Sequence, residues 1–205
     1  MMKTSLYIKC TNYNFESLFE KKGYKWFKNG YYDLNIVGIR RNLDHKVTNT
    51  FDDILVVDYY ASNCHKRQIY NITTEPGTYY MKRPLKVEGT AILVPGQYRG
   101  CFKIGLHQGR YKALCQAKPV KVYRDGNKDD VYDLDPNTTE EGMFGINIHR
   151  ASPWKLVTTI DKWSAGCQVF ANPTDFVAFM RLCDKQKEKY GNSFTYTLLD
   201  ETELV

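Results

Sequence analysis

A histidine and a cysteine in the last third of the chain have the residue types and spacing of a nucleophilic pair. His149 ends an apolar run (144–149), and after fourteen intervening residues the turn Ser-Ala-Gly (164–166) leads into Cys167. A thiol with a pKa of about 8.5 is mostly protonated at neutral pH, so a neighbouring imidazole would raise its thiolate fraction. Two small residues before the cysteine allow a sharp turn that directs backbone N–H groups toward one oxyanion. The pattern predicts a Cys167 nucleophile with His149 as its base.

These residues resemble the signature of the L,D-transpeptidase (YkuD-like) catalytic domain, which is a histidine, some fourteen to seventeen residues, then Ser/Thr-His-Gly-Cys and an apolar residue. His149, Ser164, Gly166 and Cys167 fall on this pattern. The segment Thr-Glu-Pro-Gly-Thr-Tyr (74–79) resembles the Thr-Pro-x-Gly-x-aromatic segment that such domains carry on an early strand. The resemblance covers about residues 50–185, and the chain also looks like uncharacterised members of this group found in bacteriophages of gut bacteria.

Two positions depart from the family pattern. Ala165 stands where the family usually has a second histidine, which removes a polar contact near the thiol. Gln168 and Val169 replace the usual apolar-Arg or apolar-Asn pair, which affects the residues that recognise the substrate carboxylate in the family.

The resemblance implies a cysteine acyl-transfer enzyme that acts on peptidoglycan stem peptides. Cys167 would attack the carbonyl of an L-centred diamino acid before a D-residue and form a thioester. His149 would act first as base and then as acid, and the Arg150 carbonyl would fix its tautomer. Backbone N–H groups around Gly166 and Cys167 would form the oxyanion hole, and Ser164 would support the turn.

Three alternatives to a hydrolase of wall peptides follow from the same residues. An amine in place of water would make the enzyme a transpeptidase. A non-catalytic wall-binding or virion protein that keeps the fold is favoured by Ala165, and a cysteine protease acting on ordinary proteins is the third. We expect hydrolysis in phage lysis, as an endolysin. The N-terminus lacks the apolar stretch of a secretory signal, which predicts synthesis in the cytoplasm and action at the bacterial wall after release.

Composition narrows the classes of partner. The net charge of +6 comes from scattered residues, among them Arg40, Arg41 and 185–189, with no basic stripe, zinc-finger spacing or glycine-rich phosphate loop. We therefore expect no nucleic-acid partner, no membrane partner and a monomer, with the mild positive charge suited to an anionic wall polymer. The six cysteines show no C-x-x-C pair, which favours a reducing compartment over a disulfide framework.

The hydrophobic pattern predicts one mostly β (α+β) domain over residues 1–205, with residues 1–45 as an N-terminal elaboration. By resemblance this is a YkuD-like β-sandwich or mixed sheet with flanking helices. A short helix is expected over 14–22, and a long helix follows the cysteine from Asn172 to Tyr190, with Phe176, Val177 and Cys183 on its buried face. Strands are expected at 33–40, 53–60, 67–74, 91–94, 100–106, 112–115, 119–124, 144–149 and 194–199.

Metal sites have weaker signals. Asp125, Asn127, Asp129 and Asp133 have the spacing of the start of a calcium loop, although Pro136 occupies the position of the usual glutamate. We expect no required cofactor, a structural Ca²⁺ as one alternative, and a solvated acidic turn as the other. No histidine–cysteine spacing predicts zinc. His107 is expected to be a hydrogen-bonded structural histidine.

Overall fold

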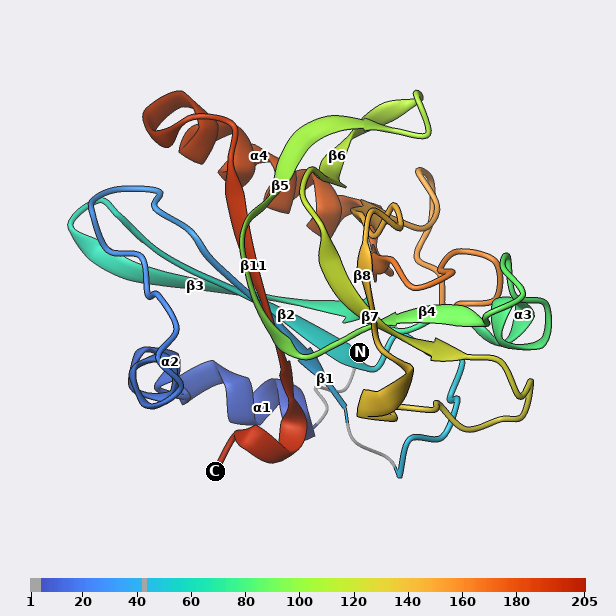
Figure 1. Ribbon diagram of the computed structural model, residues 1–205. Coiled ribbons are helices and arrows are strands. Elements are labelled where there is room, and N and C mark those ends of the chain that lie inside the picture. The colour runs from blue at the N-terminus through green and yellow to red at the C-terminus, as the bar shows by residue number, and fades with distance from the viewer. Residues whose placement is uncertain (1–4, 42–43) are drawn as a thin grey trace.

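Eight strands close into a mixed β-barrel in the computed structural model, which describes residues 5–41 and 44–205 (Figure 1). Their order around the barrel is β1-β11-β5-β6-β9-β10-β3-β2. The β1/β11 and β9/β10 pairs are parallel, and the other neighbours are antiparallel. The strands are β1 (Asn35–Arg40), β2 (Asp53–Ala61), β3 (Cys64–Thr73), β5 (Gly96–His107), β6 (Tyr111–Gln116), β9 (Ile148–Arg150), β10 (Gln168–Phe170) and β11 (Phe194–Asp200).

Burial on both faces explains why the centres of β1 (36–39) and β2 (54–57) carry no polar side chain. All six residues of β1 are buried, and β2 has the same pattern except at Tyr60. Leu55 and Val57 pack into the main core, whereas Ile54 and Val56 pack outside the barrel against the N-terminal helices. A strand covered on both faces shows no alternation of polar and apolar residues.

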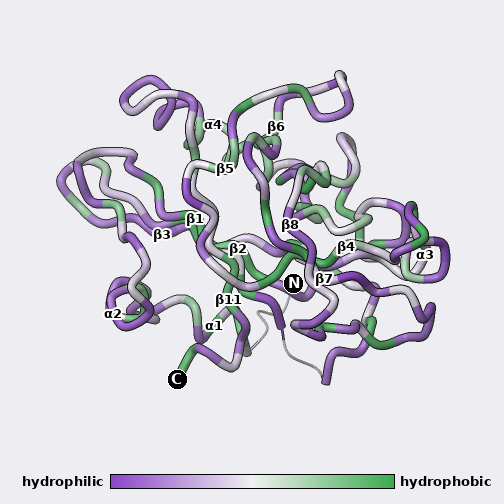
Figure 2. The backbone as a smooth tube through the Cα atoms, in the orientation of Figure 1, coloured by the Kyte–Doolittle hydropathy of each residue, from purple (hydrophilic) through white to green (hydrophobic). Residues whose placement is uncertain are grey.

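A second sheet and four helices surround the barrel (Figure 1). The sheet contains β4 (Thr90–Leu93), β7 (Val120–Asp125) and β8 (Glu140–Gly142). The helices are α1 (Ser5–Asn12), α2 (Phe15–Lys21), α3 (Thr78–Lys82) and α4 (Pro173–Tyr190), and two 3-10 turns occupy Pro136–Thr138 and Glu201–Glu203. Hydrophobic segments concentrate where the barrel strands and β4 meet, and hydrophilic segments form the outer loops (Figure 2). None of the helices in the described ranges is long and apolar enough to cross a bilayer.

Most elements lie where the sequence predicts them, and the mostly β class is confirmed. Asn14 caps α2 by accepting a hydrogen bond from the Ser17 amide, and Asn172 caps α4 through the Thr174 amide. The main sheet is mixed, which is one of the two expected arrangements, and it closes into a barrel instead of forming a sandwich. The sequence predictions omitted α1, α3, β8 and β10. Met1–Thr4, at the start of the N-terminal segment discussed above, lie outside the described residues.

Two local predictions were wrong. In the long helix, Val177 is 47% exposed, because the buried face continues through Leu182, Cys183 and Gln186. Of the run 144–149, only the end is strand β9, since the left-handed φ of +73° at Gly145 interrupts an extended backbone.

Candidate active site

The strand register places Cys167 and His149 on the same face of the barrel wall. Parallel pairing aligns Val169 with His149 and Gln168 with Ile148, so Cys167, just before β10, lies level with Asn147. Aligned residues of parallel strands point to one face, and a two-residue offset on adjacent strands separates the Cα atoms by about 8 Å. Both side chains line one cavity of about 790 Å³. The structure therefore brings together the two residues that the sequence predicts as a pair.

The turn before the cysteine requires glycine at its last position. Gly166 has a φ of +116°, and a Cβ there would lie 2.2 Å from the Ala91 carbonyl oxygen of the small sheet. Ser164, fully buried, accepts a hydrogen bond from the Gly166 amide (3.1 Å) and donates to the Cys167 carbonyl (2.8 Å). These contacts fix the direction in which Cys167 leaves the turn.

The segment 74–79 supports the same turn, although it is neither strand nor, before Thr78, helix. The Gly77 amide donates to the Ser164 carbonyl (3.0 Å). A Cβ at Gly77 would lie 2.3 Å from the Asp161 carbonyl oxygen, so the two loops touch through backbone. The expectation of a strand here was wrong, because β3 ends at Thr73 and α3 begins at Thr78.

Hydrogen bonds fix the tautomer of His149. Its Nδ1 lies 2.9 Å from the Arg150 carbonyl oxygen, which can only accept, so Nδ1 carries the proton and Nε2 is the free base. The Tyr111 hydroxyl donates to the same carbonyl (3.2 Å) and lies 3.3 Å from Nδ1. The imidazole is thus held on one edge by Arg150 and Tyr111.

His107 belongs to the same cavity. Its ring stacks on that of His149, with centroids 4.0 Å apart and planes 20° apart. Its Nδ1 lies 3.1 Å from the Asn147 side-chain nitrogen, which as an amide N–H donates to it. His107 is hydrogen-bonded, as expected, and it also packs directly on the predicted base.

Burial keeps both predicted catalytic groups neutral at rest. Desolvation, followed by the charge of His107, lowers the pKa of His149 to about 3. Desolvation raises the pKa of the Cys167 thiol to about 11, against a smaller opposing effect of the Asn147 amide. Both shifts disfavour the thiolate that the sequence predicts. The thiol donates to the Gly145 carbonyl oxygen (3.4 Å), and a neutral thiol and a neutral imidazole that line one cavity suit proton transfer during attack, not a preformed ion pair.

Of the two amides expected in the oxyanion hole, one is engaged and one is free to serve. The Gly166 amide is occupied by the Ser164 hydroxyl. Among the described residues no acceptor is found for the Cys167 amide, which leaves it as the candidate donor. The Asn147 amide, 3.5 Å from the Cys167 sulfur, is a second donor beside the nucleophile.

Comparison of the chain with protein-family models, curated proteins and solved structures finds no match. The link to a family therefore rests on the likeness in residues 74–79 and 149–167, and what it implies is a proposal.

The predicted calcium ligands are engaged with each other and with backbone. The Asp125 carboxylate accepts from the Asp133 amide, and Asp129 accepts from the Val131 amide and the Asn127 side chain. Burial raises the pKa of Asp125 to about 6. Within the described ranges, no group of three or more His, Cys, Asp or Glu side chains is placed to hold a metal ion. Calcium binding stays a prediction that these contacts do not favour.

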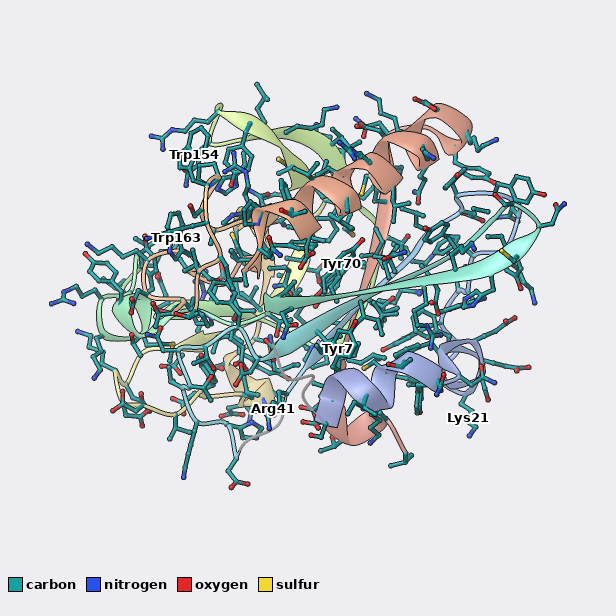
Figure 3. The ribbon with its side chains drawn as sticks, turned by 180° about the vertical axis from the view of Figure 1, so that it is seen from behind. Tyr7, Lys21, Arg41, Tyr70, Trp154 and Trp163 are labelled. Carbon is teal, nitrogen blue, oxygen red and sulfur yellow. The ribbon has the colours of Figure 1, made fainter. Side chains whose placement is uncertain are left out.

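Several cavity residues have no signal in the sequence. Tyr111 and Asn147 reach the histidines from β6 and from the segment before β9. Trp163, 41% exposed, lies on the loop between β9 and β10, and the more exposed Trp154 is on the same side of the molecule (Figure 3). Only the i, i+2 relation of Asn147 to His149 on an extended segment could have indicated a shared face.

Proposed function

We propose that the protein is a cysteine acyl-transfer enzyme that cleaves peptidoglycan stem peptides at an L,D bond. The observation that carries the proposal is the placement of Cys167 and His149 on one face of neighbouring strands, both lining one cavity. The orientation of His149 by the Arg150 carbonyl leaves Nε2 as a free base. The choice of substrate rests on the resemblance of His149, Ser164, Gly166 and Cys167 to the L,D-transpeptidase signature.

The contacts support a two-step acyl transfer. The Cys167 thiol gives its proton to Nε2 of His149 as sulfur bonds to the substrate carbonyl carbon, and the oxyanion faces the Cys167 amide. The carbon–nitrogen bond then breaks, and the imidazolium returns the proton to the leaving amine. Water, deprotonated by His149, attacks the thioester and releases the acid and the thiol. An amine at this step would give transpeptidation.

We place the enzyme among the hydrolases that serve phage lysis, on its likeness to phage-type members of the family. Peptidoglycan incubated with the protein and an excess of a D-amino acid, followed by mass spectrometry of the fragments, tests this choice. Hydrolysis predicts new free carboxyl ends and few exchanged termini. Fragments dominated by D-amino-acid exchange or by new L,D cross-links would establish a transpeptidase instead.

A non-catalytic wall-binding protein is the second candidate. Ala165 and the raised pKa of Cys167 favour it. Such a protein would sediment with purified walls yet release no peptide from them. Its wall binding would also be unchanged in Cys167→Ala.

A further inference from the structure

The cavity around Cys167 has an unbalanced charge. Three cationic side chains line it: Arg110 from the β5–β6 turn, Arg150 at the end of β9, and Lys162 from the loop before the cysteine. Among the described residues that line it there is no Asp or Glu. Burial lowers the pKa of both lining histidines, His107 and His149, which favours their neutral forms at neutral pH.

These three cations are not neutralised by the protein. In the described part of the chain, none of them forms an ion pair with a carboxylate. Arg150 lies over the Tyr111 ring at 4.0 Å and Lys162 over the Tyr79 ring at 4.4 Å. Contacts with ring faces hold a cation in place and leave its charge available.

The nearest acid along the chain belongs to a neighbouring pocket. Asp161 lines the pocket formed with α3 and is not among the residues of the Cys167 cavity. Its carboxylate accepts hydrogen bonds from the Asn49 and Thr78 side chains, which hold it to the α3 loop. That pocket adds Arg83, whose guanidinium lies over the Tyr79 ring, whereas its Lys82 pairs with Asp130 (3.2 Å).

The positive charge acts on the site itself. After desolvation, Arg110 and Arg150 are the charges that lower the pKa of His107, and Arg150 also lowers that of Tyr111 against the effect of burial. A cleft with one sign of charge raises the local concentration of ligands with the opposite sign.

We infer that Arg110, Arg150 and Lys162 are specificity-determining residues, and that they select acyl donors with a free carboxylate beside the bond under attack. This inference rests on the proposed function for its reaction and on the cavity for its charge preference. It predicts that a stem peptide with a free carboxylate next to the scissile bond is preferred over its amide.

Alkylation of Cys167 by iodoacetate and by iodoacetamide measures the charge preference without any substrate. The two reagents attack the same thiolate and differ in charge. The ratio of the iodoacetate rate to the iodoacetamide rate is therefore independent of the thiol pKa. Peptide mass spectrometry gives the ratio at Cys167. Cys64, exposed on the β2–β3 hairpin at the opposite end of the barrel from α3, is the reference in the same sample (Figure 1).

Arg110→Gln, Arg150→Gln and Lys162→Gln should each lower the ratio at Cys167 by about threefold at low salt, and leave it unchanged at Cys64. Salt should lower the wild-type ratio toward that of the variants. Lys21→Gln, an equal loss of charge on α2 far from Trp163, is the matched control (Figure 3). An equal ratio in the wild type and all three variants would overturn the inference.

Inorganic phosphate and a short peptide with a free carboxylate are then compared as protectants of Cys167 from iodoacetamide. Stronger protection by the peptide than by its amide supports carboxylate selection, whereas protection by phosphate alone would overturn it. Charge preference without turnover of wall peptides would refute the proposed function and keep the cavity's selectivity. Equal turnover of free and amidated peptides would refute the carboxylate selection and keep the proposed function.

Discussion

Two polar regions meet at residues 164–170 and differ in whether their cations have carboxylate partners. Inside the barrel, the buried Arg40 guanidinium bonds to Thr74 and pairs with Glu75, with Nη1 left without a hydrogen-bond partner among the residues that the structure describes, while Asp53 accepts from the Thr74 amide and hydroxyl. Gln168, also buried, accepts from the Tyr196 hydroxyl (2.7 Å). On the other face, the Cys167 cavity keeps cations without carboxylate partners and a free imidazole nitrogen.

The difference separates groups that hold the turn from groups that meet a ligand. Gln168 donates to the Gly166 carbonyl (3.3 Å), so the interior network reaches the turn that presents Cys167. Removing a partner from the network leaves a buried charge without compensation, whereas removing a cavity group leaves only a larger cavity. We expect large stability effects inside and large activity effects outside.

The largest stability effect should follow from Arg40→Met. The change leaves Asp53 and Glu75 buried without their counter-charge, and should lower the free energy of unfolding by about 3–5 kcal/mol at pH 7. The loss should shrink toward pH 5, because protonation of Asp53, whose pKa is raised to about 6, replaces the missing cation. Urea unfolding at both pH values measures this. Arg110→Gln, in the cavity, should change the free energy of unfolding by no more than about 0.5 kcal/mol. An equally small effect of Arg40→Met would refute the contrast between the two regions.

The next largest effect is expected for Gly166→Ala, because Gly166 lies in the turn where the two regions meet. The added Cβ meets the Ala91 carbonyl oxygen, and alanine is strained at a φ of +116°, so unfolding should become easier by about 2–3 kcal/mol. Gly96→Ala is the matched control, since nothing lies within 4 Å of its Cβ. Thermal unfolding of both variants should separate them, and equal melting temperatures would show that the turn can relax.

A smaller effect distinguishes the regions by pH. The pKa of His149 falls from 6.5 to about 3 on folding, so the unfolded chain binds more protons and stability declines as pH drops below about 6.5. The decline should be on the order of 2 kcal/mol between pH 7 and pH 5. Asp53 acts in the opposite direction, because its raised pKa makes the folded state the better proton acceptor between pH 6 and 3.8. Urea unfolding at several pH values gives the free energy of unfolding as a function of pH for wild type and His149→Gln. The wild-type curve should fall more steeply below pH 6.5, and parallel curves would exclude a depressed pKa of His149.

The residues that the sequence predicted are those whose neighbours are close along the chain. The caps of α2 and α4, the Ser164 turn and the contact of His149 with the next carbonyl all span four residues or fewer. The pairing of His149 with Cys167 was also predictable, because the motif implies a shared site.

What the sequence did not predict depends on strands far apart in the chain. Arg40 is one of the scattered cations of the sequence, but β1 carries it into the barrel, where it is 1% exposed. His107 reaches His149 only because β5, β6 and β9 are neighbours in the closed sheet. The neutral state of Cys167 and His149 likewise follows from burial, which residue types alone do not report.

Intact-protein mass spectrometry tests the central claim, that Cys167 and His149 form one acyl-transfer unit. The protein is mixed with a synthetic stem peptide that has a D-residue after an L-centred diamino acid and is quenched in acid at early times. The account predicts a mass increase equal to the acyl group in the wild type, mapped to Cys167. The adduct should be absent in Cys167→Ala and at least a hundredfold slower to form in His149→Ala, the usual scale of a lost general base. An adduct that persists in Cys167→Ala, or that forms at the wild-type rate without His149, would contradict the account, as would a wild-type protein that neither forms an adduct nor cleaves the peptide.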